Sequence, residues 1–153
     1  MAQVIVEDRE IIAVTLQSWL RVIGLGAAVG LAIWVLSALL GRYAFEPLLG
    51  ETTNGFIVAG KVATVLVATG AVLGMVRLGV ARPIVIAVAS AALLWDLSVW
   101  SQGMFWLEAV AWSILLYAAS YALFGWIARH SSALVAMIVT IIIVVVIRLA
   151  LAA

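Results

Sequence analysis

The sequence predicts an all-α protein in which several long helices cross a membrane as an integral membrane helix bundle. Of the 153 residues, 68% are hydrophobic and only 10% are charged, and the mean hydropathy is +1.33. A soluble domain carries about 25% charged residues because its surface must be hydrated. Residues 22–41 and 109–128 carry no charge, and a helix of about 20 apolar residues crosses the roughly 30 Å hydrocarbon core of a bilayer. The composition therefore predicts a membrane protein.

The stretch WDLSVWSQGMFWLEAVAW, residues 95–112, marks one predicted surface of the bilayer. It holds four of the seven tryptophans and a short polar segment, Ser101-Gln102-Gly103, and long apolar runs flank it on both sides. Tryptophan concentrates where a helix passes from hydrocarbon to lipid headgroups, because its ring is apolar while its N–H needs a partner. We therefore expect two helices to meet there through a tight turn.

Residues 1–20 form a separate predicted segment that precedes a single transmembrane domain, residues 21–153. Four consecutive charged residues, Glu7, Asp8, Arg9 and Glu10, interrupt its apolar positions. Two interpretations remain open: an amphipathic helix in the headgroup plane, or a hydrated extension of the first spanning helix. A secretory signal would begin with positive charge, whereas residues 1–10 are rich in acids. We therefore expect the first hydrophobic segment to be a retained membrane anchor.

The first predicted span covers residues 22–41, and the second covers residues 56–76. The polar connection between them contains Pro47. Because proline disfavours helical geometry in the residue before it, the first helix is expected to end by Phe45. Asn54-Gly55 is then expected to form a turn before the second helix.

Each of these two spans contains a pair of glycines four residues apart, Gly26 with Gly30 and Gly70 with Gly74. In a membrane, small residues allow two helix backbones to approach closely and to gain dispersion contacts. Both pairs are therefore predicted to be helix-packing surfaces.

Three further spans are predicted at residues 83–100, 104–128 and 133–152. The third span is the weakest, because only twelve residues separate Pro83 from Asp96. A four-span arrangement, in which one segment is re-entrant or interfacial, remains an alternative. The fifth span is rich in valine and isoleucine, which also favour strands, but its length and unbroken apolarity favour a helix.

The basic residues predict how the bundle is oriented. With five spans and a cytoplasmic N-terminus, five of them lie on the cytoplasmic side and three on the outer side: Arg9, Arg21, Arg77, Arg82 and Arg129 against Arg42, Lys61 and Arg148. Cytoplasmic loops carry an excess of lysine and arginine, so the N-terminus is predicted to be cytoplasmic.

This topology also predicts that four ionisable residues share one level on the outer side: Lys61, Asp96, Glu108 and Arg148. Ionisable groups within membranes often mark ion or proton pathways, so one interpretation is a polar layer inside the bundle. The alternative, which we favour, is that Lys61 and Arg148 extend to the headgroups and that the two acids lie near water.

A stripe of hydroxyl groups, Ser113, Tyr117 and Tyr121, recurs every four residues along one side of the predicted fourth span. Such a stripe is a candidate lining for a wet cavity. Hydroxyl groups in membrane helices more often form hydrogen bonds with a neighbouring helix, and we favour that interpretation.

No cofactor, metal site, catalytic site or nucleic-acid partner is predicted. The chain has no cysteine and a single histidine, His130, whereas a metal site needs several nitrogen, sulfur or carboxylate ligands. The net charge of +1 is too small to indicate nucleic acid, which requires a basic patch.

Together these observations predict a small polytopic membrane protein that is a structural or accessory subunit of a membrane assembly. Its partners would be the lipid bilayer and either copies of itself, as a homo-oligomer, or other membrane subunits. The alternative is a small oligomeric channel or transporter that uses the outer polar layer.

Overall fold

A computed structural model describes the backbone of residues 2–49 and 52–152 and the side chains of residues 16–48 and 54–151. Every regular element in these ranges is a helix: α1 (Ala2–Leu40), the π-helix η1 (Gly41–Phe45), α2 (Glu46–Leu49), α3 (Thr52–Arg77), α4 (Pro83–Leu93), α5 (Leu97–Trp100), α6 (Trp106–His130) and α7 (Ala133–Ala152). Five segments are long and apolar enough to cross a membrane, at residues 16–48, 54–77, 83–100, 106–130 and 133–151. The predicted all-α bundle with five spans is confirmed, and it is compatible with a multi-pass membrane protein.

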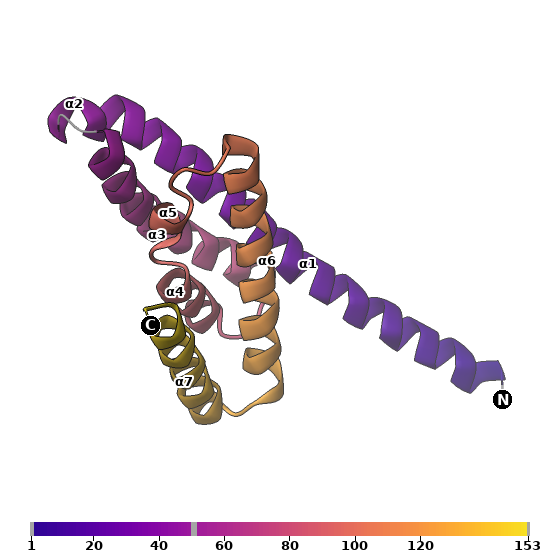
Figure 1. The fold of residues 1–153 in the computed structure, drawn as a ribbon. Coiled ribbons are helices and arrows are strands. Elements are labelled where there is room, and N and C mark those ends of the chain that lie inside the picture. Colours follow the sequence, from indigo (N-terminus) through magenta and orange to yellow (C-terminus); the bar gives the residue numbers. More distant parts are fainter. Residues whose placement is uncertain (1, 50–51, 153) are drawn as a thin grey trace.

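The bundle is built around α1, α3, α4 and α6, with α7 at one edge. Helix α1 packs along α6 and α3, α4 contacts α3, α6 and α7, and α7 contacts α4 and α6 (Figure 1). The N-terminal part of α1 extends past the other helices (Figure 1). The helix runs without a break through residue 20, where the sequence predicted the boundary of the interfacial segment. The amphipathic character predicted for residues 1–20 depends on side chains that lie largely outside the described ones.

The helical path continues beyond Phe45, so the predicted stop before Pro47 is wrong. Glu46 has right-handed helical geometry (φ −58°, ψ −47°), and its N–H donates to the carbonyl of Gly41, five residues back. In an α-helix, a proline ring would clash with the carbonyl four residues earlier. The wider π-turn of η1 relieves this clash, and α2 therefore continues to Leu49.

Asn54 and Gly55 lie in the first turn of α3, which corrects the prediction that they form a turn. A Cβ atom on Gly55 would lie 3.1 Å from Glu46 N and 3.3 Å from Phe45 C. The missing side chain therefore allows the start of α3 to lie directly against η1 and α2, which closes the hairpin between the first two spans.

The third span consists of two helices separated by a break. Helix α4 ends at Leu93, and Leu94 and Asp96 leave helical geometry with ψ values of 20° and 19°, before α5 adds one more turn. The predicted tight turn follows, with Gly103 at φ +80°, and α6 begins at Trp106, two residues later than predicted. The break matters for the site because it places Asp96 on an interrupted segment of backbone.

The core lies between α1, α3, α4 and α6 and contains large side chains that are almost fully buried: Met75, Ile86, Tyr117, Tyr121 and Phe124. Beside this core, α1 approaches α6 very closely at Gly26 and Gly30. A Cβ atom on Gly26 would lie 2.8 Å from Tyr117 O, and one on Gly30 would overlap the backbone of Ser113. The first glycine pair is thus a contact surface between α1 and α6.

The second glycine pair does not pack in this way. A Cβ atom on Gly70 would have no heavy atom within 4 Å among the described residues, and one on Gly74 would meet only Leu25 Cδ1, at 3.9 Å. Gly70 is exposed on α3, because that side of the helix faces out of the bundle. Within a single chain, Gly70 and Gly74 therefore do not form the close helix-packing surface that the sequence predicted.

Candidate ionic site at the break in the third span

Asp96, at the break between α4 and α5, connects three helices through two ion pairs. Its carboxylate lies 3.7 Å from Nζ of Lys61 on α3 and accepts a 2.5 Å hydrogen bond from Nη2 of Arg148 on α7. We call these three residues the ionic cluster. All three belong to the predicted outer layer, and the fold brings them together.

Arg148 also binds the end of α4, because its Nη1 donates to Ala92 O at 3.1 Å. The last turn of a helix has carbonyl groups without intrahelical partners, and it carries the negative end of the helix dipole. A guanidinium group is therefore favoured at this position. Because α4 ends at Leu93, Arg148 can donate to two acceptors there, the Ala92 carbonyl and the Asp96 carboxylate.

The ionic cluster lies on the flank of the bundle and is only partly covered. The side chains of Lys61 and Arg148 are each 38% exposed, and that of Asp96 is 25% exposed. An exposed ion pair contributes about 0–1 kcal/mol to the free energy of unfolding. Removing one partner of a fully buried pair lowers it by about 3–5 kcal/mol. The ion pairs of Asp96 are partly covered, so they lie between these two cases. Two cations and one anion leave the site with a net positive charge.

Glu108, the fourth predicted member of the layer, lies outside the ionic cluster. It is exposed in the first turn of α6, and it forms no ion pair with any of the described side chains. The positive end of the α6 dipole favours a carboxylate at this position. The predicted layer of four residues is therefore reduced to three.

The hydroxyl stripe of α6 faces neighbouring helices. Ser113 Oγ donates to Gly30 O on α1 at 2.8 Å. Tyr117 and Tyr121 are each only 1% exposed. The stripe therefore packs between helices and does not line an open, water-filled path within one copy.

A cavity of about 20 Å³ lies between α1, α3, α5 and α6, and the two chain neighbours of Asp96, Trp95 and Leu97, form part of its wall. Four hydroxyl groups line it: Ser37, Thr64, Ser98 and Ser113. Ser98 Oγ is buried there without a hydrogen-bond partner in the described part of the chain. A cavity of about 10–15 Å³ or more holds one water when several polar groups surround it, so this cavity fits a single water.

Sequence reasoning did not identify several of these polar contacts. Ser37 and Thr64 donate to carbonyl groups of their own helices, Ile33 O and Gly60 O, and single hydroxyl residues in apolar helices commonly do so. Ser120 on α6 pairs with Ser90 on α4 through a 2.7 Å hydrogen bond between their Oγ atoms. No periodic pattern in the sequence distinguishes these serines from others in the spans.

Among the described side chains, those of residues 16–48 and 54–151, no group of three or more His, Cys, Asp or Glu could hold a metal ion. His130 Nδ1 instead lies 3.0 Å from Trp126 O in its own helix. Comparison with protein-family models, with curated proteins and with solved structures finds no match to this chain.

Proposed function

We propose that this chain is a structural or accessory membrane subunit, without catalytic activity, that assembles with a second copy of itself through the face formed by α3, α4 and α7. The observation that carries the proposal is the position of the ionic cluster on the flank of an apolar bundle. Both of its cations are more than a third exposed, and one acid cannot neutralise them. Ionisable groups in membranes pair with opposite charges, so a carboxylate from a second subunit would complete the site.

The shape of this face supports the proposal. Two apolar hollows lie on the two sides of α4, one of about 340 Å³ toward α7 and one of about 320 Å³ toward α3. Val88 and Ala92 line both hollows, and Ala92 O binds Arg148, so the hollows lead to the ionic cluster. Small side chains on α4 allow a helix of another subunit to approach closely.

A second copy of the chain supplies the missing charge. Glu46 follows the first predicted span and Glu108 lies in the first turn of α6, both at the outer end of the bundle. Neither forms an ion pair within the described residues. Helix α7 is also available for contact, since only 11% of its apolar segment is buried in one copy, against 44% for the third span. Self-assembly is therefore the arrangement that the charges of this chain favour.

The proposal includes an orientation. Arg21, Arg77, Arg82 and Arg129 belong to the end of the bundle opposite the ionic cluster. Because cytoplasmic ends carry an excess of arginine and lysine, we assign this end and the N-terminus to the cytoplasmic side.

Native mass spectrometry of the protein released from lipid nanodiscs tests the assembly. Val88→Trp fills the space between the two hollows, and Leu115→Trp is a matched control, because Val88 on α4 and Leu115 on α6 are 60% and 59% exposed. We expect an oligomer for the wild type and for Leu115→Trp, and a monomer for Val88→Trp. A monomeric wild type would refute the proposed assembly.

A second candidate function is transport by such an oligomer along the outer polar layer. This candidate is favoured by the water-sized cavity that Trp95 and Leu97, the chain neighbours of Asp96, help to line, and by the Ser98 hydroxyl, which has no partner there among the described residues. Ion or proton flux into proteoliposomes that depends on Asp96, and that Asp96→Asn abolishes while the oligomer persists, would support transport over a purely structural role.

A further inference from the structure

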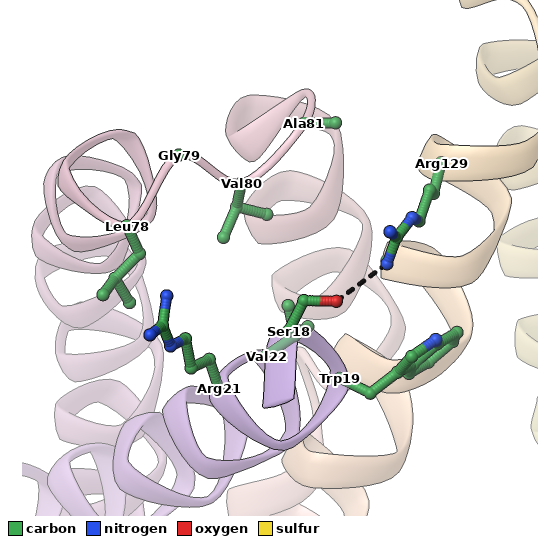
Figure 2. A pocket seen from close by; sticks show the side chains of 10 residues that line it. Ser18, Trp19, Arg21, Val22, Leu78, Gly79, Val80, Ala81 and Arg129 are labelled. Atoms are coloured by element: carbon green, nitrogen blue, oxygen red, sulfur yellow. Dashed lines mark hydrogen bonds between the residues drawn. The ribbon is translucent and has the colours of Figure 1, made fainter. Parts of the chain in front are cut away.

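A pocket of about 250 Å³ opens at the end of the bundle opposite the ionic cluster (Figure 2). It lies between residues 18–22 of α1, the loop that joins α3 to α4, and the end of α6. Arg21 from α1 and Arg129 from α6 stand on two sides of it, and Trp19 lies beside α6 (Figure 2).

The two arginines of the pocket retain most of their hydrogen-bond donors for a ligand. Arg129 Nη1 donates to Ser18 Oγ at 2.8 Å, which holds this guanidinium at the rim (Figure 2). Arg21 forms no hydrogen bond or ion pair with the described residues. A guanidinium carries five N–H donors in a fixed plane. Arg21 can use all five of them to bind a ligand, and Arg129 can use those that do not bind Ser18.

A third arginine, Arg82, lies next to the loop that lines the pocket and anchors this loop to the end of α6. Arg82 Nη1 donates to Ala128 O at 3.0 Å and to Ser131 O at 2.7 Å. These bonds tie the loop between α3 and α4 to the end of α6. The loop is therefore held in place beside Arg21 by contacts that do not involve the ligand.

The pocket has no acidic neighbour among the described side chains. Their acids, Glu46, Asp96 and Glu108, belong to elements at the other end of the bundle. On α1 itself, Glu10 precedes Arg21 by eleven residues, about 16 Å along an α-helix. Arg77 and Arg82 add positive charge beside the loop, so the described side chains give the pocket a net positive charge.

We propose that this pocket binds a phosphate group, either in the headgroup of an anionic phospholipid or in a free phosphate species. Two guanidinium groups from different helices match the planar, two-pronged recognition of phosphate oxygens. The apolar wall formed by Val22 and Leu78 suits the glycerol and upper acyl part of a lipid. Trp19 also lines the pocket, and tryptophan is enriched at the level of the lipid headgroups. The volume is below the roughly 300–1,000 Å³ of pockets for drug-sized ligands, which fits a small headgroup.

The test measures binding to the purified full-length protein in neutral detergent, with three probes: phosphatidylglycerol, phosphatidylcholine and inorganic phosphate. Arg21→Gln removes a pocket charge without breaking any internal contact. Arg42→Gln is the matched control, because Arg42 is an exposed arginine in η1 at the other end of the bundle. Arg21→Lys keeps the charge and removes the planar fork.

We expect the wild type and Arg42→Gln to bind phosphatidylglycerol in preference to phosphatidylcholine, and Arg21→Gln to bind it about tenfold more weakly, as for the loss of one charge-assisted hydrogen bond. Arg21→Lys is expected to fall between them. Selective binding of phosphatidylglycerol identifies a lipid headgroup as the ligand, and equal binding of inorganic phosphate identifies a free anion. Equal weakening by Arg21→Gln and Arg42→Gln, or no binding of either anionic probe, would overturn the proposal.

Discussion

Gly30 of α1 lies against the backbone of Ser113 on α6, and the Ser113 hydroxyl donates a 2.8 Å hydrogen bond to Gly30 O. The two features depend on each other. Because glycine has no side chain, the helices approach closely enough for a short serine side chain to reach a main-chain carbonyl of the other helix. This contact, together with the close approach at Gly26, holds α1 directly against α6.

The close approach of α1 and α6 predicts a large difference between glycines on the same helix. Gly30→Ala is expected to lower the free energy of unfolding by about 1–3 kcal/mol, as for overpacking of a tight interface. Gly24→Ala is the control, since a Cβ atom there would meet nothing within 4 Å in the described structure. Denaturant unfolding in detergent measures both, and equal stability of the two variants would contradict the packing.

The hydrogen bond of Ser113 predicts a difference between two serines whose hydroxyl groups are buried. Ser113→Ala is expected to destabilise the protein by about 0.5–1.5 kcal/mol, because it removes the hydrogen bond that joins α6 to Gly30 O of α1. Ser98→Ala removes a hydroxyl that has no partner in the described part of the chain, so we expect it to have a smaller effect or to raise stability. The same unfolding measurement compares them, and a larger loss for Ser98→Ala would show that a bound water makes this hydroxyl essential.

The ionic cluster predicts unequal coupling energies within one site. Asp96→Asn is expected to destabilise the protein by more than about 1 kcal/mol, because it leaves two partly covered cations without an anion. A second change, Arg148→Met, is expected to restore part of this loss, and Lys61→Met less, because Lys61 lies 3.7 Å away while Arg148 forms a direct hydrogen bond.

Double-mutant cycles in lipid measure these couplings. Glu108→Gln is the control, since Glu108 has no ion pair among the described residues. Strictly additive effects for both Asp96 pairs would show that headgroups or water, and not the neighbouring helices, neutralise the cations.

The five-span topology predicts that two loops on either side of the third span face opposite compartments. Ala81→Cys, before α4, and Gln102→Cys, after α5, are exposed positions in a chain without native cysteine. With an impermeant thiol reagent on sealed vesicles, we expect only one of the two variants to be labelled from a given side. Labelling of both from the same side would mean that the interrupted third span does not cross the membrane.

The sequence by itself located the five apolar segments that are long enough to be spans. The fifth span was predicted at residues 133–152 and α7 occupies Ala133–Ala152, because the length of an apolar run is a local property that can be compared directly with bilayer thickness. The short third span was also visible as the twelve residues between Pro83 and Asp96. The prediction failed at Pro47, where a π-turn accommodates the proline within a continuing helix.

Only the tertiary structure decided which of these local patterns meet. Gly26 and Gly70 begin the same four-residue glycine pattern, yet Gly26 contacts α6 and Gly70 faces out of the bundle. Asp96 and Glu108 both lie near the same turn, yet only Asp96 is paired, because the early end of α4 and the path of α7 bring Arg148 to it. The spacing of residues along one helix determines which of them lie on the same face. Which face becomes an interface depends on where the other helices lie.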